Sequence, residues 1–320
     1  MHRRRIFFIL KILLAVLVLL WVVQKVHYKT IISTIRNPQS PHCIIFALLM
    51  LIFNIGLQWL RWYYLLRLIK RDITVKESLV SLFGGLTVGL VTPGRLGEFG
   101  RTLFLSNIDH VKTLSLIFID KFYTSVIMIV FGIWGVISFL TFQLGSDIFL
   151  LAPLLGLGLL ATLLGLFLLT HPWNIRSFFY HVSLLLPFRE KVKLFIDGLD
   201  HFNIKKARPF IFMSLMLYFI YIFQFSLLAL AFENISLHVL ITSTTATMFT
   251  KVILPFSIGD LGIREGAAIY FFKNFGINKA TAFNSAFLLF LINVMIPAII
   301  GLFFVPRMGW RENDHSITSS

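Results

Sequence analysis

Two short motifs place charged side chains among prolines and glycines inside apolar stretches of the chain. The first runs from Pro93 to Arg101 (PGRLGEFGR), and the second runs from Pro255 to Arg264 (PFSIGDLGIR). Shifted by 162 residues, the proline, a glycine, an acidic residue and a second glycine coincide. Proline ends a helix and glycine allows a tight turn, so each motif predicts a break between two helices. The predicted turn residues are Pro93, Gly97, Gly100, Pro255, Gly259 and Gly262.

The charged groups of both motifs are candidates for binding a charged ligand. Guanidinium groups form paired, charge-assisted hydrogen bonds to phosphate oxygens, and carboxylates neutralise arginines or bind an amine. The alternative is that these ion pairs only hold each turn together. The candidate binding residues are Arg95, Glu98, Arg101, Asp260, Arg264 and Glu265. Three further candidates are Asp120 and Lys121, at the entry of the third predicted span, and Lys251, eight residues before Gly259.

The composition identifies the environment in which these motifs work. Of the 320 residues, 58% are hydrophobic and 13% are charged, and the mean hydropathy is +0.86. Soluble domains are roughly half apolar and a quarter charged, so the composition indicates a membrane protein. The net charge of +15 is carried by short segments between apolar runs, which favours contact with anionic lipid headgroups over nucleic acid.

Six runs are long and apolar enough to span about 30 Å of hydrocarbon as helices. The predicted spans are Ile6–Val23, Cys43–Leu60, Phe122–Leu144, Ile148–Thr170, Phe210–Phe232 and Thr281–Val305. The apolar stretches 78–106 and 239–275 contain the two motifs and are predicted as broken, re-entrant hairpins. The fold class is therefore all-α, integral membrane.

Lysine and arginine counts predict the orientation, because positively charged short loops stay in the cytoplasm. If both hairpins return to the side they left, the cytoplasmic segments hold 17 Lys and Arg residues and the opposite segments hold 5. Both termini are then cytoplasmic, in a multi-pass protein of the cell inner membrane. The two hairpins enter from opposite sides and form an inverted repeat. Transporters built on inverted repeats bind cargo near the midplane, between broken helices.

The remaining segments fit a single membrane domain over residues 1–305. The stretch Ile6–Val23 is predicted to be an uncleaved anchor, since it is long and no small-residue cleavage site follows it. Residues 171–209 mix apolar and basic side chains, which favours one or two amphipathic helices on the cytoplasmic membrane surface. Residues 306–320 form a polar tail.

No catalytic or cofactor motif appears in the sequence. Cys43 is the single cysteine, so neither an internal disulfide nor a cysteine zinc site is available. The nine histidines form no HExxH pattern, and no phosphate-binding loop, dinucleotide motif or GxSxG is present. We therefore expect no metal, no cofactor and no enzymatic activity.

At these motifs the chain resembles the lysylphosphatidylglycerol synthase transmembrane, or flippase-like, family. The matching strings are Leu90–Arg101 and Leu254–Glu265, with the pair Asp120-Lys121 downstream of the first. Asp260 stands where a further glycine is common in the family, and Asp120-Lys121 replaces the more usual Glu-Arg. The resemblance implies translocation of a phospholipid between leaflets. It also implies that a separate enzyme makes the lipid, because the aminoacyl-transferase domain of bifunctional members is not part of this sequence.

The leading hypothesis is a translocase whose two hairpins form a polar cleft for a lipid headgroup that contains phosphate. Arg95, Arg101 and Arg264 would contact the phosphate, and the carboxylates would balance them. An alternative is an intramembrane enzyme with Glu98 or Asp260 as general base. A further alternative is an accessory subunit that docks a lipid-modifying enzyme through residues 171–209.

Overall fold

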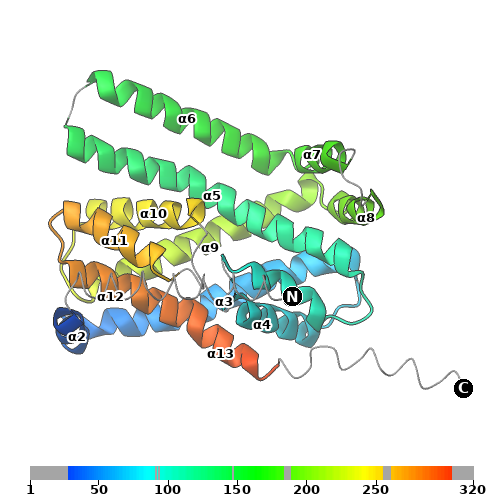
Figure 1. The fold of residues 1–320 in the computed structure, drawn as a ribbon, viewed down its shortest axis with the longest axis horizontal. Helices are drawn as coiled ribbons and strands as arrows, with labels where there is room; N and C mark the ends of the chain where they lie inside the picture. Colours follow the sequence, from blue (N-terminus) through cyan, green and yellow to red (C-terminus); the bar gives the residue numbers. More distant parts are fainter. Residues whose placement is uncertain are drawn as a thin grey trace, which may run out of the picture.

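The protein is a bundle of helices, several of which are long enough to cross a membrane (Figure 1). The computed structural model describes residues 28–90, 92, 94–145, 148–183, 189–254 and 261–304, and no strand occurs within these ranges. Five runs are long and apolar enough to be spans. They are α3 (Pro41–Ile69), α5 (His110–Leu144), α6 (Ile148–Thr170), α9 (Ile204–Leu230) and the continuous run of α12 (Lys279–Phe290), η2 (Leu291–Met295) and α13 (Ile296–Leu302).

Five of the six predicted spans are thus confirmed as long apolar helices. The sixth, Ile6–Val23, lies outside the described residues, as does the tail 306–320. The other elements are shorter: α2 (Tyr28–Arg36), α4 (Val75–Leu90), the 3-10 helix η1 (Leu96–Phe104), α7 (Trp173–Ser183), α8 (Arg189–Asp200), α10 (Leu237–Ile253) and α11 (Ile263–Asn274). Helices α7 and α8 fall in the segment predicted to be amphipathic and lie together at one end of the bundle (Figure 1).

Helices α3 and α9 pack side by side in opposite directions. Near the end of α3, the Tyr64 hydroxyl donates to the carbonyl of Lys206 at 3.1 Å, close to the start of α9. Just before the start of α3, the Ser40 N–H donates to the carbonyl of Ala231 at 3.0 Å, directly after the end of α9. These two contacts define the two ends of the bundle.

The segment from α4 to η1 starts and ends on the same side of the bundle, at the end of the bundle where α3 terminates. Lys70 Nζ donates to the Ser106 carbonyl at 3.1 Å, and the Ser106 hydroxyl donates to Glu77 Oε1 at 3.0 Å. Partial burial raises the pKa of Glu77, but hydrogen bonds from Thr74 and Ser106 and the charge of Lys70 outweigh it and hold the pKa below its usual value. A charged Glu77 therefore ties the start of α4 to the chain that follows η1.

The segment from α10 to α11 begins and finishes at the opposite end of the bundle. Glu233 lies between α9 and α10, and its Oε2 accepts from the N–H of Asn278, which caps α12, at 3.1 Å. Helix α10 packs along α5 and against α11. The two motif-bearing segments thus start from opposite ends of the helices around them.

The last span carries a π-helical turn, η2, and packs against α3, α4 and α9. Asn293 in η2 donates to Gln224 Oε1 at 2.7 Å, and Gln224 donates to the Ala47 carbonyl at 2.7 Å. Thr87 on α4 donates to the Ala298 carbonyl on α13, also at 2.7 Å. A π-helical turn inside a helix often marks a functional site. Here it places a buried amide where three spans meet.

Helix α6 lies at the edge of the bundle, against α5 (Figure 1). A Cβ at Gly158 or Gly165 would collide with side chains of α5, so these two glycines let α5 approach closely. The Trp134 indole N–H on α5 also donates to Thr162 Oγ1 on α6 at 2.8 Å. Most of its leucines are exposed. Apolar side chains on that outer face are expected where the solvent is lipid.

The close packing of α13 on α4 gives a test of the fold. A Cβ at Gly301 would lie 2.2 Å from the Phe83 carbonyl oxygen and 2.1 Å from Thr87 Oγ1, so Gly301→Ala forces the two helices apart. Overpacking of this kind costs about 1–3 kcal/mol. We expect a lower melting temperature for the purified variant in detergent.

Gly56→Ala on α3 is the matched control, because nothing lies within 4 Å of the Cβ position there. Alanine also favours the helix over glycine, so this variant should melt at or slightly above the wild-type temperature. Equal melting temperatures for both variants would contradict the packing of α13 on α4.

Candidate functional site

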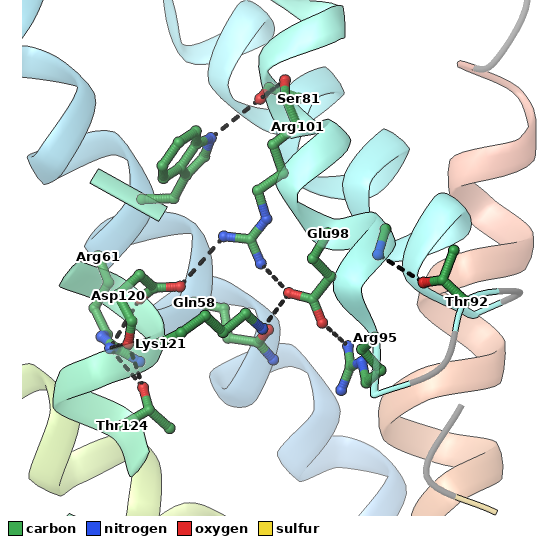
Figure 2. Close-up of polar contacts among 12 residues, drawn as sticks. Gln58, Arg61, Ser81, Thr92, Arg95, Glu98, Arg101, Asp120, Lys121 and Thr124 are labelled. Carbon is green, nitrogen blue, oxygen red and sulfur yellow. Dashed lines mark hydrogen bonds and ion pairs between the residues drawn. The ribbon is translucent and has the colours of Figure 1, made fainter. Parts of the chain in front are cut away.

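Glu98 in η1 is surrounded by three cationic side chains (Figure 2). Arg101 Nη2 lies 2.6 Å from Glu98 Oε2, and Arg95 Nη2 lies 2.7 Å from Oε1. Lys121 on α5 donates to Oε2 as well. The Glu98 side chain is only 1% exposed. A carboxylate buried to this degree is stable only when it is paired and hydrogen-bonded. All three cations pair with Glu98, and Arg101 and Lys121 also donate hydrogen bonds to it.

Asp120 is the second carboxylate of the cluster and joins η1 to α3 through two arginines (Figure 2). Arg101 Nη1 lies 3.3 Å from Asp120 Oδ2, so Arg101 bridges both carboxylates. Arg61 Nη2 on α3 lies 2.8 Å from Asp120 Oδ1 and also donates to Thr124 Oγ1 at 2.9 Å. The cluster of six residues consists of Arg61, Arg95, Glu98, Arg101, Asp120 and Lys121, and we call it the charge cluster.

The glycines of α4 allow η1 to lie directly against it. A Cβ at Gly85 would stand 2.1 Å from Arg101 Cγ, and one at Gly89 would stand 2.7 Å from Glu98 Cγ. At Gly97, the Cβ position is 2.3 Å from the Val88 carbonyl oxygen. These glycines therefore let the backbones of α4 and η1 approach closely.

The turn between α4 and η1 holds Arg95 in a strained backbone conformation. Arg95 has φ 56° and ψ 29°, in the left-handed region that residues with a Cβ rarely occupy. Thr92 stabilises the turn by accepting a hydrogen bond from the Gly97 N–H at 2.6 Å. Strain of this kind persists only where surrounding contacts enforce it, and it is concentrated at functional sites. Pro93 lies outside the described residues.

Aromatic rings line the buried side of the charge cluster. The Arg101 guanidinium carbon lies 5.3 Å from the Trp62 ring centre, and that of Arg61 lies 4.8 Å from the Phe210 ring centre. Ser81 accepts from Trp62 Nε1 at 3.2 Å and donates to the Arg101 carbonyl at 2.8 Å. Cation–π contacts strengthen when water is excluded, so the rings hold both guanidinium groups in place.

The charge cluster has a buried side and an open side. The side chains of Arg61, Glu98 and Arg101 are at most 2% exposed, whereas Arg95 and Asp120 reach 12% and Lys121 reaches 38%. Leu96, next to Arg95, exposes 65% of its surface. The open side therefore offers cationic groups beside an exposed apolar side chain.

The second motif forms a local ion pair at the start of α11. Arg264 Nη2 lies 2.8 Å from Glu265 Oε1, and Glu265 Oε2 accepts from the Gly262 N–H at 2.6 Å. Gly262 has φ 90°, which its lack of a Cβ allows. Both charged side chains are at most 2% exposed, and the Arg264 guanidinium lies 5.7 Å from the Phe290 ring centre. Glu265 thus caps α11 and neutralises Arg264.

The structure brings together the first-motif residues and the pair Asp120-Lys121, and it pairs Arg264 with Glu265. Pro255, Gly259 and Asp260 lie outside the described residues. Lys251 lies, half-buried, in the last turn of α10, and Gly100 is in η1, where a Cβ would make only ordinary contacts. The meeting of both motifs in one cleft stays a prediction. The described residues contain no group of three or more metal-ligating acidic, histidine or cysteine side chains.

Sequence reasoning missed Arg61, which holds Asp120 from the buried side. The predicted span Cys43–Leu60 ends one residue before Arg61, which leaves Arg61 outside the span. Helix α3 continues to Ile69, and Arg61 therefore lies more than two turns inside it. The signal was the apolar and aromatic sequence from Trp62 to Leu66, which continues the run beyond Arg61.

The burial of the Arg61–Asp120 pair generates a stability prediction. Removing one partner of a buried ion pair leaves an uncompensated charge and costs about 3–5 kcal/mol. Arg61→Met keeps the apolar bulk of the side chain and should lower the melting temperature strongly. Arg176→Met is the control, because the Arg176–Asp200 pair has a similar distance of 2.7 Å but side chains that are 57% and 38% exposed.

An exposed pair contributes less than about 1 kcal/mol, so the control should melt close to the wild type. The comparison separates burial from charge, since both variants remove one arginine. A wild-type melting temperature for Arg61→Met would show that Arg61 does not hold Asp120.

Comparison with known proteins agrees with the resemblance found in the sequence. The family model for the lysylphosphatidylglycerol synthase transmembrane region matches residues 8–301 of the sequence. The match includes both motifs and every described helix except the last residue of α13. Searches of curated proteins and of solved structures returned no significant match. With a match over nearly its whole length, the chain belongs to the lysylphosphatidylglycerol synthase transmembrane family.

Proposed function

We propose that this multi-pass membrane protein is a lipid translocase that guides a phosphate-containing headgroup across the membrane while the acyl chains stay in the bilayer. The observation that carries the proposal is the charge cluster: η1, α3 and α5 contribute four cations and two carboxylates to one site. Charged groups inside a membrane protein typically mark a substrate or ion pathway.

The arrangement of the two motif-bearing segments supports an inverted repeat of re-entrant hairpins. Helix α4 has 16 residues and α10 has 17, which correspond to about 24 and 26 Å, less than the roughly 30 Å of the hydrocarbon core. Each is followed by a break and a second helix that returns to the end where the segment began. Such paired half-helices surround the binding sites of many transporters.

The depth of the charge cluster fits a site loaded from the cytoplasmic leaflet. Arg61 lies eight residues before the end of α3, and Asp120 lies ten residues after the start of α5. At 1.5 Å per residue, these positions are about 12 and 15 Å from the same end of the bundle. The count of basic residues assigns this end to the cytoplasm. Both termini are then cytoplasmic in the cell inner membrane.

The partner implied by this proposal is a separate enzyme that makes the lipid. Catalysis by the chain itself has less support, because both oxygens of Glu98 already contact cations, which leaves neither free to take a proton from a substrate. Use of helices α7 and α8 as a docking face would not require a charge cluster inside the bundle.

Cysteine labelling tests the orientation. In a Cys43→Ala background, Asp72→Cys lies between α3 and α4, and Lys273→Cys lies at the end of α11. Both positions are exposed. We expect a membrane-impermeant maleimide to label residue 273 in intact cells and residue 72 only after the membrane is opened. Labelling of both positions from the same side would contradict the inverted repeat.

Translocation can be measured with a fluorescent phospholipid in vesicles that contain the purified full chain. Glu98→Gln removes the central negative charge and should slow lipid movement by about tenfold or more, equal to at least about 1.4 kcal/mol on the barrier. Glu190→Gln on α8 is the matched control, since Glu190 is exposed and outside the charge cluster.

The proposed function would be wrong if wild-type vesicles moved lipid no faster than empty vesicles. Mass spectrometry of the recovered lipid distinguishes transport from chemistry. An unchanged lipid mass supports the translocase, and a changed mass supports the enzyme.

A further inference from the structure

We propose that a hydrated path leads from the charge cluster along one face of α3 to the middle of the bundle, where Asn54 and Asn293 bind water. The ligand of this site is water, and uncharged amide side chains hold it. The path would keep a headgroup hydrated beyond the charge cluster, and in that use it rests on the proposed function. Its existence does not depend on lipid movement.

Polar side chains follow one face of α3 inward from the charge cluster. Gln58 lies three residues before Arg61, and Asn54 lies four residues before Gln58. Residues at these spacings lie on the same face of a helix. Gln58, which is drawn with the charge cluster in Figure 2, donates from Nε2 to Asn54 Oδ1 at 2.5 Å. The face of α3 that carries Arg61 therefore stays polar for two further turns.

The two amides in the middle of the bundle each carry one polar atom without a partner. Asn54 Nδ2 and Asn293 Oδ1 make no hydrogen bond within the part of the chain that the structure describes. Asn54 is fully buried, and Asn293 is 1% exposed. An unsatisfied buried amide is unfavourable, and internal water commonly fills this role. One amide needs an acceptor and the other needs a donor, and water provides both.

Asn54 and Asn293 lie at similar depths. Helices α3 and α12 begin at the same end of the bundle, because Ser40 and Asn278 both hydrogen-bond to the chain just after α9. Asn54 lies 13 residues after the start of α3, and Asn293 lies 14 residues after the start of α12. These distances correspond to about 20 and 21 Å along the helices. The unpartnered donor and acceptor therefore lie at one level, on two elements that pack together.

Solvent reaches this path where it meets the charge cluster. The Lys121 side chain is 38% exposed, and Gln58 is half-buried. From Gln58, the hydrogen bond to Asn54 leads directly to the buried amides. Water can therefore enter beside the charge cluster and follow polar groups inward.

The path ends before it reaches the other side of the bundle. Asn293 donates to Gln224, and Gln224 donates to the Ala47 carbonyl, so these contacts are already made. Beyond Ala47, toward the start of α3, Cys43 packs in an apolar cluster with Ala231 and Phe232. The path is therefore an inlet from one side rather than a channel through the membrane.

Cysteine reactivity tests the path in the full chain, reconstituted in lipid nanodiscs in a Cys43→Ala background. The probe is iodoacetamide, which reacts with the thiolate that forms beside water and not with the thiol that persists in hydrocarbon. We expect Asn54→Cys and Asn293→Cys to react about tenfold faster than Ile52→Cys, in proportion to their thiolate fractions. Ile52 is the matched control, because it is 70% exposed on the same helix, on the outer surface where lipid is the solvent.

Two amide positions are used so that the test does not depend on the folding of one variant. Reaction at either position no faster than that of Ile52→Cys would overturn the path. Val294→Cys is a second control, because Val294 is 3% exposed and adjacent to Asn293. It should react little, and a rate equal to that of Asn293→Cys would mean that η2 opens as a whole, against a path along α3.

A blocking variant tests the route. Asn54→Leu places an apolar side chain of similar size on the path, so adding it to Asn293→Cys should slow labelling to the rate of Val294→Cys. Phe53→Leu is the matched control, because Phe53 is 60% exposed on the outer surface of α3, and it should leave the rate unchanged. Unchanged labelling with Asn54→Leu would show that water reaches η2 by another route.

The vesicle assay separates this inference from the proposed function. Reactive cysteines at both amide positions in a chain that moves no lipid would refute the translocase alone. Lipid movement by a chain whose amide positions react no faster than Ile52→Cys would refute the path alone.

Discussion

The structure depends on one constraint: the charges that lie within its apolar helices must neutralise one another. A lone charge at the centre of a spanning helix costs about 2.5–3.5 kcal/mol on insertion scales. Arg101 meets this constraint by contacting Glu98 on its own element and Asp120 on α5, while Arg61 reaches Asp120 from α3. Because Arg101, Asp120 and Arg61 lie on three different elements, their ion pairs fix where η1 lies relative to two spans. The site and the packing of this part of the fold are the same set of contacts.

This constraint explains the sequence on both sides of the turn. Bringing Arg101 and Glu98 inward requires η1 to lie directly on α4, and the glycines at 85 and 89 remove the side chains that would prevent it. Arg95 lies directly before the 3-10 helix in a left-handed backbone conformation, and from there its side chain reaches Glu98. The small residues, the break and the charges therefore depend on one another. Together they allow a polar site while η1 stays packed against α4.

The spans were predictable from sequence because a helix in lipid needs a long apolar run, and that requirement is local. Helices α5 and α6 end at the predicted residues Leu144 and Thr170. The position of Arg61 inside α3 could be inferred from the apolar and aromatic residues that follow it, but its role could not, because that role depends on which elements pack against α3. The pairing of Asp120 with Arg61 and Arg101 depends on tertiary packing, since these three residues lie on separate elements. A single sequence contains no signal for such a contact.

The two motifs look alike in sequence, yet their described charges are satisfied in different ways. In the first motif, Arg101 pairs with Asp120 and Glu98 pairs with Lys121, and both partners lie about twenty residues away along the chain. In the second, Arg264 pairs with the adjacent Glu265, which also caps α11. The second pair balances its charge between neighbouring residues, whereas the ion pairs of the first motif join it to α3 and α5. The partners recruited from α3 and α5 therefore make the first motif part of the packing between elements, whereas the described charges of the second motif are balanced at the start of α11.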